Sequence, residues 1–166
     1  GVPQAHHIRR KITEMCIVAE TVYGLAYTAA MQGSLHPSGV FMASPLESNV
    51  GRLLATLRLG ECYTSLMDIT GGLIVTGPFE KEFTNPETRK YLEKYLKANP
   101  DIPAEHRFRL IKYIEDLVSG KVGDWMLSES ILGSGPPEDQ MMAIWSNYDL
   151  ERQKKIAKVN AGIEKE

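Results

Sequence analysis

The sequence lacks the features that mark several common classes of protein. Two cysteines among 166 residues are too few for a disulfide framework, and the four histidines form no cluster with metal-ligand spacing. No apolar run approaches the roughly 18 residues of a membrane-spanning helix. The opening stretch GVPQAHHIRRK has no apolar core, so it is not a secretory signal. We therefore expect neither a metal site within the chain nor a membrane span.

Charge and nucleotide motifs are equally uninformative. The formal net charge is −2, without the basic face typical of a nucleic-acid-binding protein. There is no phosphate-binding loop, dinucleotide fingerprint or nucleophile elbow. A hydrophobic share of 43% and a charged share of 24% are ordinary for one globular domain. We expect a single domain over residues 1–166, located in the cytoplasm, in which Cys16 and Cys62 are buried, unreactive thiols.

Apolar spacing and helix caps predict the main elements. Steps of three and four residues between apolar positions indicate a long amphipathic helix over residues 5–32. A connection rich in Gly, Pro and Ser follows. Ser44 and Glu47 then form a capping box around Pro45, which predicts a second long helix that ends at Gly71-Gly72.

The second half of the chain predicts further helices. Asn85 caps a third helix that ends at about Pro100, and Pro103 begins a fourth that ends at Gly120. A glycine-containing, loop-like segment follows over residues 120–137, and a last helical region over 137–162 is broken near Asn147. The only β-like run, 73–76, is too short to build a sheet. The sequence thus predicts an all-α bundle with about four main helices.

Two segments carry residues that chemistry could use. Gly71-Gly72 permits a sharp turn and a close approach to the backbone, so it is either a tightly packed helix stop or a surface that meets a cofactor or phosphate. Glu129 lies between two serines, close to Trp125 and Met126. It is either an exposed loop glutamate or a carboxylate in an apolar corner, whose raised pKa would suit proton transfer.

The order and spacing of several segments resemble a known family. The segments HIRRKITEM, ETVYGLAYTAA, DITGGLIVTGP, NPETRKYLEKYLK, HRFRLIKYIEDL and SESILGSGPPEDQ together resemble the C-terminal domain of the 4-hydroxyphenylacetate 3-hydroxylase family. Within that family they are most similar to its 4-hydroxybutyryl-CoA dehydratase/vinylacetyl-CoA Δ-isomerase branch. The resemblance extends from about Ala5 to Ile163, nearly the whole chain.

The resemblance implies a fold and a cofactor. It implies the helical C-terminal bundle of the acyl-CoA-dehydrogenase-like fold, in which a Gly-Gly turn after a long helix lies against FAD. Gly71 and Gly72 occupy the matching place, with Leu73, Val75 and Thr76 beside them. The dehydratases also use a [4Fe-4S] cluster, and its ligands would lie upstream of this chain. Glu129 matches a glutamate that would act as the acid or base.

The resemblance also implies partners. This chain would be the C-terminal part of a larger flavoenzyme, packed on N-terminal and middle domains of the same enzyme, and its start at Gly1 suits a fragment. The enzyme would be a homo-oligomer, with a tetramer expected, acting on a CoA thioester and binding neither nucleic acid nor membrane. We expect the isolated chain to be inactive.

One departure from the family pattern keeps other functions open. Where the dehydratases have the pattern Thr-Glu-Ser-Met-His-Gly-Ala-Gly, this chain has Leu132 in place of the histidine. The substrate could therefore differ. A flavin-dependent aromatic hydroxylase, which needs no cluster, is the first alternative. A helical assembly module without catalysis is the second.

Overall fold

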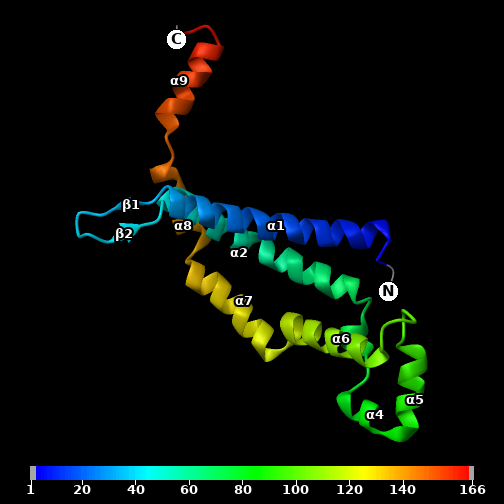
Figure 1. Ribbon diagram of the computed structural model, residues 1–166. Helices are drawn as coiled ribbons and strands as arrows, with labels where there is room; N and C mark the ends of the chain where they lie inside the picture. The colour runs from blue at the N-terminus through cyan, green and yellow to red at the C-terminus, as the bar shows by residue number, and fades with distance from the viewer. Residues whose placement is uncertain (1–2, 165–166) are drawn as a thin grey trace. The chain divides into compact units, whose positions relative to one another are not determined.

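A computed structural model describes residues 3–164, and most of them are helical (Figure 1). A two-stranded antiparallel hairpin is the only sheet in this range. In chain order the elements are α1 (His6–Met31), β1 (Ser34–Leu35), β2 (Phe41–Met42), α2 (Pro45–Ile69), α3 (Leu73–Thr76), α4 (Glu80–Thr84), α5 (Pro86–Tyr95), α6 (Ala104–Ser119), α7 (Lys121–Ser134), α8 (Pro137–Asn147) and α9 (Leu150–Asn160).

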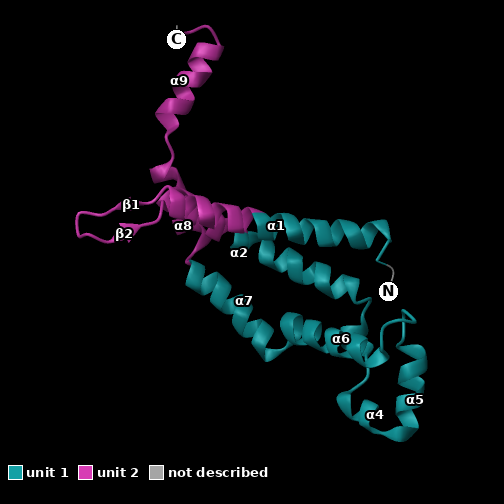
Figure 2. Ribbon diagram, viewed as in Figure 1, with its two compact units in different colours: residues 1–20, 55–134 teal, residues 21–54, 135–166 magenta. Residues whose placement is uncertain are grey.

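The chain divides into two compact units (Figure 2). Unit 1 comprises residues 1–20 and 55–134, and unit 2 comprises residues 21–54 and 135–166. Each unit has its own internal contacts. The expectation that the whole chain forms one domain stays a prediction.

Several predicted helix boundaries are confirmed. The predicted start of α2 at Pro45 is confirmed, but the Ser44 hydroxyl donates to the Glu47 carboxylate and the Ser44 amide donates to the Ala29 carbonyl, so the reciprocal backbone bonds of a capping box are not formed. The Asn85 side chain accepts a hydrogen bond from the Glu87 amide at 3.0 Å, which caps α5. The final helical region is indeed broken, since α8 ends at Asn147 and α9 begins at Leu150.

Two segments differ from the prediction. The β-like run Leu73–Thr76 is a short helix, α3, because its first two side chains pack on the core and Gly72 precedes it in the left-handed conformation. The loop-like segment after Gly120 is the helix α7. Its glycine at 123 is buried where a Cβ would collide with the Leu117 carbonyl oxygen, so the close packing of α7 on α6 overrides the helix-weakening effect of glycine.

The Gly/Pro/Ser-rich connection contains a hairpin that the sequence did not predict. Ser34 pairs with Met42 and Leu35 with Phe41. Gly39 has a φ of +83° and its amide donates to the His36 carbonyl at 2.8 Å, so the chain reverses within a few residues. Strands of two residues are too short for the alternating apolar pattern that identifies a strand in a sequence.

The core of unit 1 is a small cluster that joins α3, α4, α5 and α6. The Phe83 and Phe108 rings lie 4.6 Å apart between centroids at an angle of 37°. Other members are half-buried or buried aliphatic residues, including Leu73 and Ile74 of α3. The cluster consists of Phe83, Leu96, Ala104, Phe108 and Ile111, with Leu73, Ile74 and Leu92 packed against it.

Unit 2 has a different centre, formed by α1 and α2. Gly51 of α2 is buried. A Cβ added to it would lie 3.4 Å from the Leu25 Cβ of α1. Ala29 is also buried, and its carbonyl accepts from the Ser44 amide at 2.8 Å. The buried Gln140 donates from Nε2 to the Gly135 carbonyl at 2.9 Å, which fixes the start of α8.

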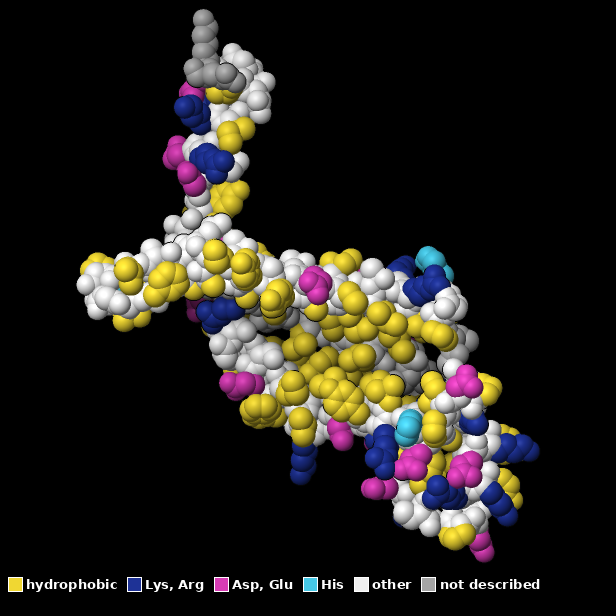
Figure 3. Space-filling view, viewed as in Figure 1, with side chains coloured by type: hydrophobic (Ala, Val, Ile, Leu, Met, Phe, Trp, Pro, Cys, Tyr) yellow, Lys and Arg dark blue, Asp and Glu magenta, His cyan; other side chains and the backbone are white. Residues whose placement is uncertain are grey.

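Many large apolar side chains remain at the surface. Figure 3 shows hydrophobic side chains gathered on one face of unit 1. Apolar patches of this kind on a soluble protein mark surfaces that contact other protein. Cys16 is also exposed and Cys62 is half-buried, so the prediction of two buried thiols is wrong for Cys16 and only partly correct for Cys62. The exposed apolar residues include Ile12, Ile17, Tyr23, Tyr27, Val75, Phe79, Tyr113, Trp125, Leu132 and Trp145.

Within residues 3–164, none of the helices has the length and apolar character needed to cross a bilayer.

The core cluster predicts a stability difference between two phenylalanines. Replacing Phe108 by alanine should lower the free energy of unfolding by about 3–5 kcal/mol, because it empties the centre of the cluster. Replacing Phe79 should cost less than about 1 kcal/mol, since that ring is 67% exposed and contacts mainly lysine side chains. Urea unfolding followed by circular dichroism measures both, and equal losses would show that the cluster is not the core.

Candidate functional site

The Gly71-Gly72 turn at the end of α2 has a backbone that favours glycine. Gly71 has a φ of +63° and Gly72 a φ of +84°, both in the left-handed region. No other residue type among those described has a positive φ. The preceding Thr70 is buried and its hydroxyl donates to the Met67 carbonyl at 2.5 Å, which closes the last turn of α2. The conformation explains why both residues are glycine.

The space in front of the turn is open. Among residues 3–164, a Cβ built on Gly71 or on Gly72 meets no other atom within 4 Å. Tight packing within the chain, the first interpretation of the dipeptide, therefore does not account for it. A ligand or another polypeptide has room to approach the backbone here.

Part of the backbone in this turn has no hydrogen-bond partner. The Gly71 amide donates to Asp68 and the Val75 amide donates to Gly72, at 3.0 and 2.9 Å. Within the described residues, the amides of Gly72 and Ile74 make no such bond. These two donors are available to an acceptor from outside the chain.

The predicted neighbours of the turn take two different roles. Leu73 packs on the core cluster, so it holds the turn in place. Val75 is 84% exposed, and Thr76 is also exposed. The Thr76 hydroxyl donates a hydrogen bond to the Gly72 carbonyl at 3.3 Å. Of the three predicted neighbours, Val75 and Thr76 have exposed side chains and Leu73 does not.

An ion pair fixes the other end of the turn. Lys11 Nζ of α1 lies 2.8 Å from Asp68 Oδ2, near the end of α2. The hydrogen bond from Lys11, with its positive charge, holds the pKa of the Asp68 carboxyl below its usual value. Both residues belong to unit 1, so the contact ties α1 to the residues that precede the glycines.

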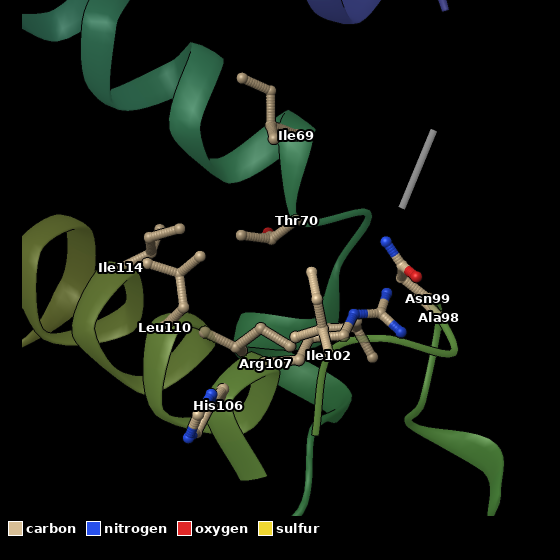
Figure 4. Close-up of a pocket in the computed structure, with 11 residues that line it drawn as sticks. Ile69, Thr70, Ala98, Asn99, Ile102, His106, Arg107, Leu110 and Ile114 are labelled. Atoms are coloured by element: carbon tan, nitrogen blue, oxygen red, sulfur yellow. The ribbon is translucent and has the colours of Figure 1, made fainter. Parts of the chain in front are cut away.

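A cleft of about 380 Å³ adjoins the turn (Figure 4). Ile69, Thr70 and Leu73, which flank the glycines, form one wall, and residues of α6 and of the α5–α6 connection form the rest. Of these lining residues only Leu73 was predicted as a site residue from the sequence. Their only signal was the helical spacing of Arg107, Leu110, Ile111 and Ile114 along α6, and this spacing is equally typical of core positions.

Glu129 lies apart from the turn. It is on α7, an exposed helical residue rather than a loop residue, and no described contact joins it to Gly71 or Gly72. Its Oε1 is 3.2 Å from the position that a Cβ on Gly133 would take, so this glycine leaves room for the carboxylate. The apolar corner expected around Glu129 is not formed by the described residues, and its role as acid or base stays a prediction.

The thiols and other potential metal ligands are dispersed. Among residues 3–164 no three His, Cys, Asp or Glu side chains are grouped so that they could hold a metal ion. Burial raises the pKa of the Cys62 thiol, with Glu61 adding to the effect and Arg58 opposing it. At neutral pH Cys62 is thus a poor thiolate donor.

Comparison with known proteins shows similarity to two kinds of enzyme, 4-hydroxybutyryl-CoA dehydratases and an oxygenase component. A 4-hydroxybutyryl-CoA dehydratase/vinylacetyl-CoA-Δ-isomerase from Clostridium aminobutyricum is 29% identical over 98% of this chain and 35% of its own length. The structure of an oxygen-tolerant archaeal 4-hydroxybutyryl-CoA dehydratase from N. maritimus has a TM-score of 0.86 and 34% identity, and covers 100% of this chain and 33% of that one.

A second structural relative shows the same fold at lower identity. The oxygenase component of a 4-hydroxyphenylacetate 3-monooxygenase, solved with FAD, has a TM-score of 0.85 and 20% identity over 96% of this chain and 33% of that one. The chain thus spans about a third of the length of these relatives.

The family profile described as 4-hydroxyphenylacetate 3-hydroxylase C terminal matches residues 1–162. The helical architecture confirms the predicted fold class. The chain therefore belongs to the 4-hydroxyphenylacetate 3-hydroxylase C-terminal family and has its acyl-CoA-dehydrogenase-like helical fold.

Proposed function

We propose that this chain is the C-terminal part of a FAD-dependent enzyme of the 4-hydroxybutyryl-CoA dehydratase/vinylacetyl-CoA Δ-isomerase type, and that the Gly71-Gly72 turn lies against the FAD. The observation that carries the proposal is the open space in front of two left-handed glycines. The dehydratases of C. aminobutyricum and N. maritimus support the reaction class.

The turn fits a flavin nucleotide by shape and by hydrogen bonding. A flat ring or a diphosphate can approach the backbone closely only where no Cβ intervenes. The free amides of Gly72 and Ile74 could then donate to its oxygen atoms, and the exposed Val75 and Thr76 would flank it. FAD, when bound, supplies the redox chemistry, while the residues of this chain hold and orient it.

Glu129 is our proposed acid or base. A carboxylate can take a proton from a carbon next to a thioester, or return one, if it lies within hydrogen-bond reach of that position. Because Glu129 is exposed on α7, the surroundings that would tune its pKa and position it must come from parts of the enzyme outside this chain.

The remainder of the enzyme would complete the site. We propose that N-terminal and middle domains and other copies of the enzyme, in a homotetramer, cover the apolar surface of unit 1, and that the [4Fe-4S] ligands and most of the CoA thioester site lie in those parts. The exposed apolar side chains support this assembly. The cytoplasmic location expected from the sequence belongs to the same proposal.

A flavin-dependent aromatic hydroxylase is the second candidate. Its support is the likeness to the oxygenase component of 4-hydroxyphenylacetate 3-monooxygenase, which shows that this fold also serves oxygenases. Leu132, in place of the dehydratase histidine, is compatible with it. An assembly module without catalysis is the third candidate, and it would bind neither flavin nor a CoA thioester.

Metal content separates the first two candidates. The full-length protein, purified without oxygen, should contain iron and acid-labile sulfide in the amounts of a [4Fe-4S] cluster, because the dehydratase reaction requires one. Iron analysis and flavin absorbance on the same sample measure both. Flavin without iron would favour the hydroxylase, and absence of both would favour the assembly module.

The turn predicts a specific loss of flavin. In the full-length protein Gly72→Val should lower the FAD retained through gel filtration, because the side chain would occupy the space in front of the turn. Gly39→Val is a matched control, since Gly39 has a φ of +83° against +84° for Gly72, and neither position has an atom within 4 Å of a built Cβ. Equal flavin content in wild type and Gly72→Val would reject the flavin contact.

If Glu129 transfers the proton, its replacement should lower turnover without lowering the flavin content. Glu129→Gln should slow the reaction about a hundredfold or more, because the amide cannot transfer the proton, while flavin content stays normal. Asp124→Asn, an exposed acid on the same helix, should leave the rate unchanged. An unaltered rate in Glu129→Gln would identify Glu129 as an ordinary surface glutamate.

A further inference from the structure

The cleft beside the turn combines apolar walls with one unpaired positive charge. Its volume of about 380 Å³ lies within the range of about 300–1,000 Å³ that is typical of small-molecule sites. No aspartate or glutamate lines it, and most of its lining is aliphatic. Its aliphatic residues are Ile69, Leu73, Ala98, Ile102, Leu110, Ile111 and Ile114.

Arg107 supplies the charge. It is half-buried, and its Nη1 donates to the Leu96 carbonyl at 2.6 Å, at the end of α5. Among the described residues it has no carboxylate partner, whereas the neighbouring Arg109 on α6 pairs with Glu105 at 2.7 Å. A guanidinium has five N–H donors, so most of those on Arg107 remain available.

The Arg107 guanidinium and the Leu110–Ile114 pair lie on different sides of the cleft. Figure 4 shows the Arg107 guanidinium extending toward the side of the cleft where Asn99 lies, while Leu110 and Ile114 lie on the opposite side, below Ile69. A ligand that fills this space would meet hydrogen-bond donors at one end and aliphatic side chains at the other.

We propose that this cleft binds a small amphipathic anion, with its carboxylate or phosphate head on Arg107 and its apolar body along Ile69, Leu110 and Ile114. Guanidinium groups bind both kinds of oxyanion through paired N–H bonds. The aliphatic walls would favour a hydrocarbon chain or a flat ring over a hydrated inorganic ion. The site does not depend on the proposed flavin contact.

The alternative is that Arg107 only caps α5. Its bond to the Leu96 carbonyl satisfies one of the groups left unpaired at a helix end, and this role needs no ligand. A capping role predicts that loss of Arg107 lowers stability and leaves anion binding unaffected. A ligand role predicts that loss of Arg107 weakens anion binding. It also predicts that a negative charge placed elsewhere in the cleft weakens anion binding in the same way.

Calorimetric titration of the full-length protein, as isolated, tests the site with two probes. Octanoate carries a carboxylate and ADP carries phosphates, so comparing them identifies the preferred head group. At least one should bind with one site per chain. Arg107→Met should weaken that binding about tenfold or more, and Arg109→Met, the matched control on the same helix, should leave it unchanged.

A second pair of variants guards against misfolding. Leu110 lines the cleft and is 58% exposed, so Leu110→Asp should fold yet repel the anion and abolish binding. Tyr113→Asp adds the same charge to the same helix at a residue that is 63% exposed and outside the cleft, and it should bind normally. Circular dichroism checks folding, and flavin absorbance in each variant separates this result from the flavin proposal.

Failure of both probes to bind the wild type would overturn the proposal. So would equal effects of the Arg107 and Arg109 variants, or normal binding by a folded Leu110→Asp protein. A loss of flavin from the Arg107→Met protein without a change in anion binding would also count against the cleft, because it would assign Arg107 to the flavin contact instead.

Discussion

The packing of Leu73 and Ile74 on the Phe83–Phe108 cluster is the contact on which the candidate site depends. Beyond backbone hydrogen bonds to adjoining residues, no described atom packs where a side chain on either glycine would begin, so the position of the turn follows from what holds its two ends. The cluster fixes the residues after the turn, and the ion pair between Lys11 and Asp68 fixes those before it. The pair is exposed and contributes little stability by itself, whereas burial of the aromatic cluster stabilises the fold more strongly. A turn held in this way keeps its open face without side chains of its own.

The small number of buried residues has a physical consequence for the chain. Apolar side chains buried within each unit are few, and large ones such as Tyr23, Trp125 and Trp145 stay in contact with water. Hydrophobic burial is the main driving force of folding, so covering this surface would stabilise the chain further. Since the relatives are about three times as long as this chain, additional polypeptide exists in them that could do so. This combination is consistent with a mostly helical chain that has a modest core of its own.

The fold leaves the reaction undecided. The same arrangement of helices occurs in a dehydratase and in an oxygenase component, so a helical likeness cannot choose between proton transfer on a thioester and oxygen chemistry on an aromatic ring. Under the proposed function, the choice would rest on local groups such as Glu129, the open backbone at Gly72 and the groups that the remainder of the enzyme would place near them. The proposed anion site at Arg107 is a separate feature, in the cleft beside the turn.

The sequence by itself determined the long helices, their caps and the family. Apolar steps of three and four identified α1, Ser44 and Asn85 identified the starts of α2 and α5, and the order of short segments identified the relatives. Such features depend on residues near one another in the chain, so they can be read locally. Tertiary structure alone decided that Leu73–Thr76 is helical, that α7 is a helix despite its glycines, and that Arg107 faces an apolar cleft beside the turn. The packing of α3 and the lining of the cleft depend on contacts between different elements, and α7 depends on the close approach of Gly123 to the end of α6, so packing outweighs local propensity in each case.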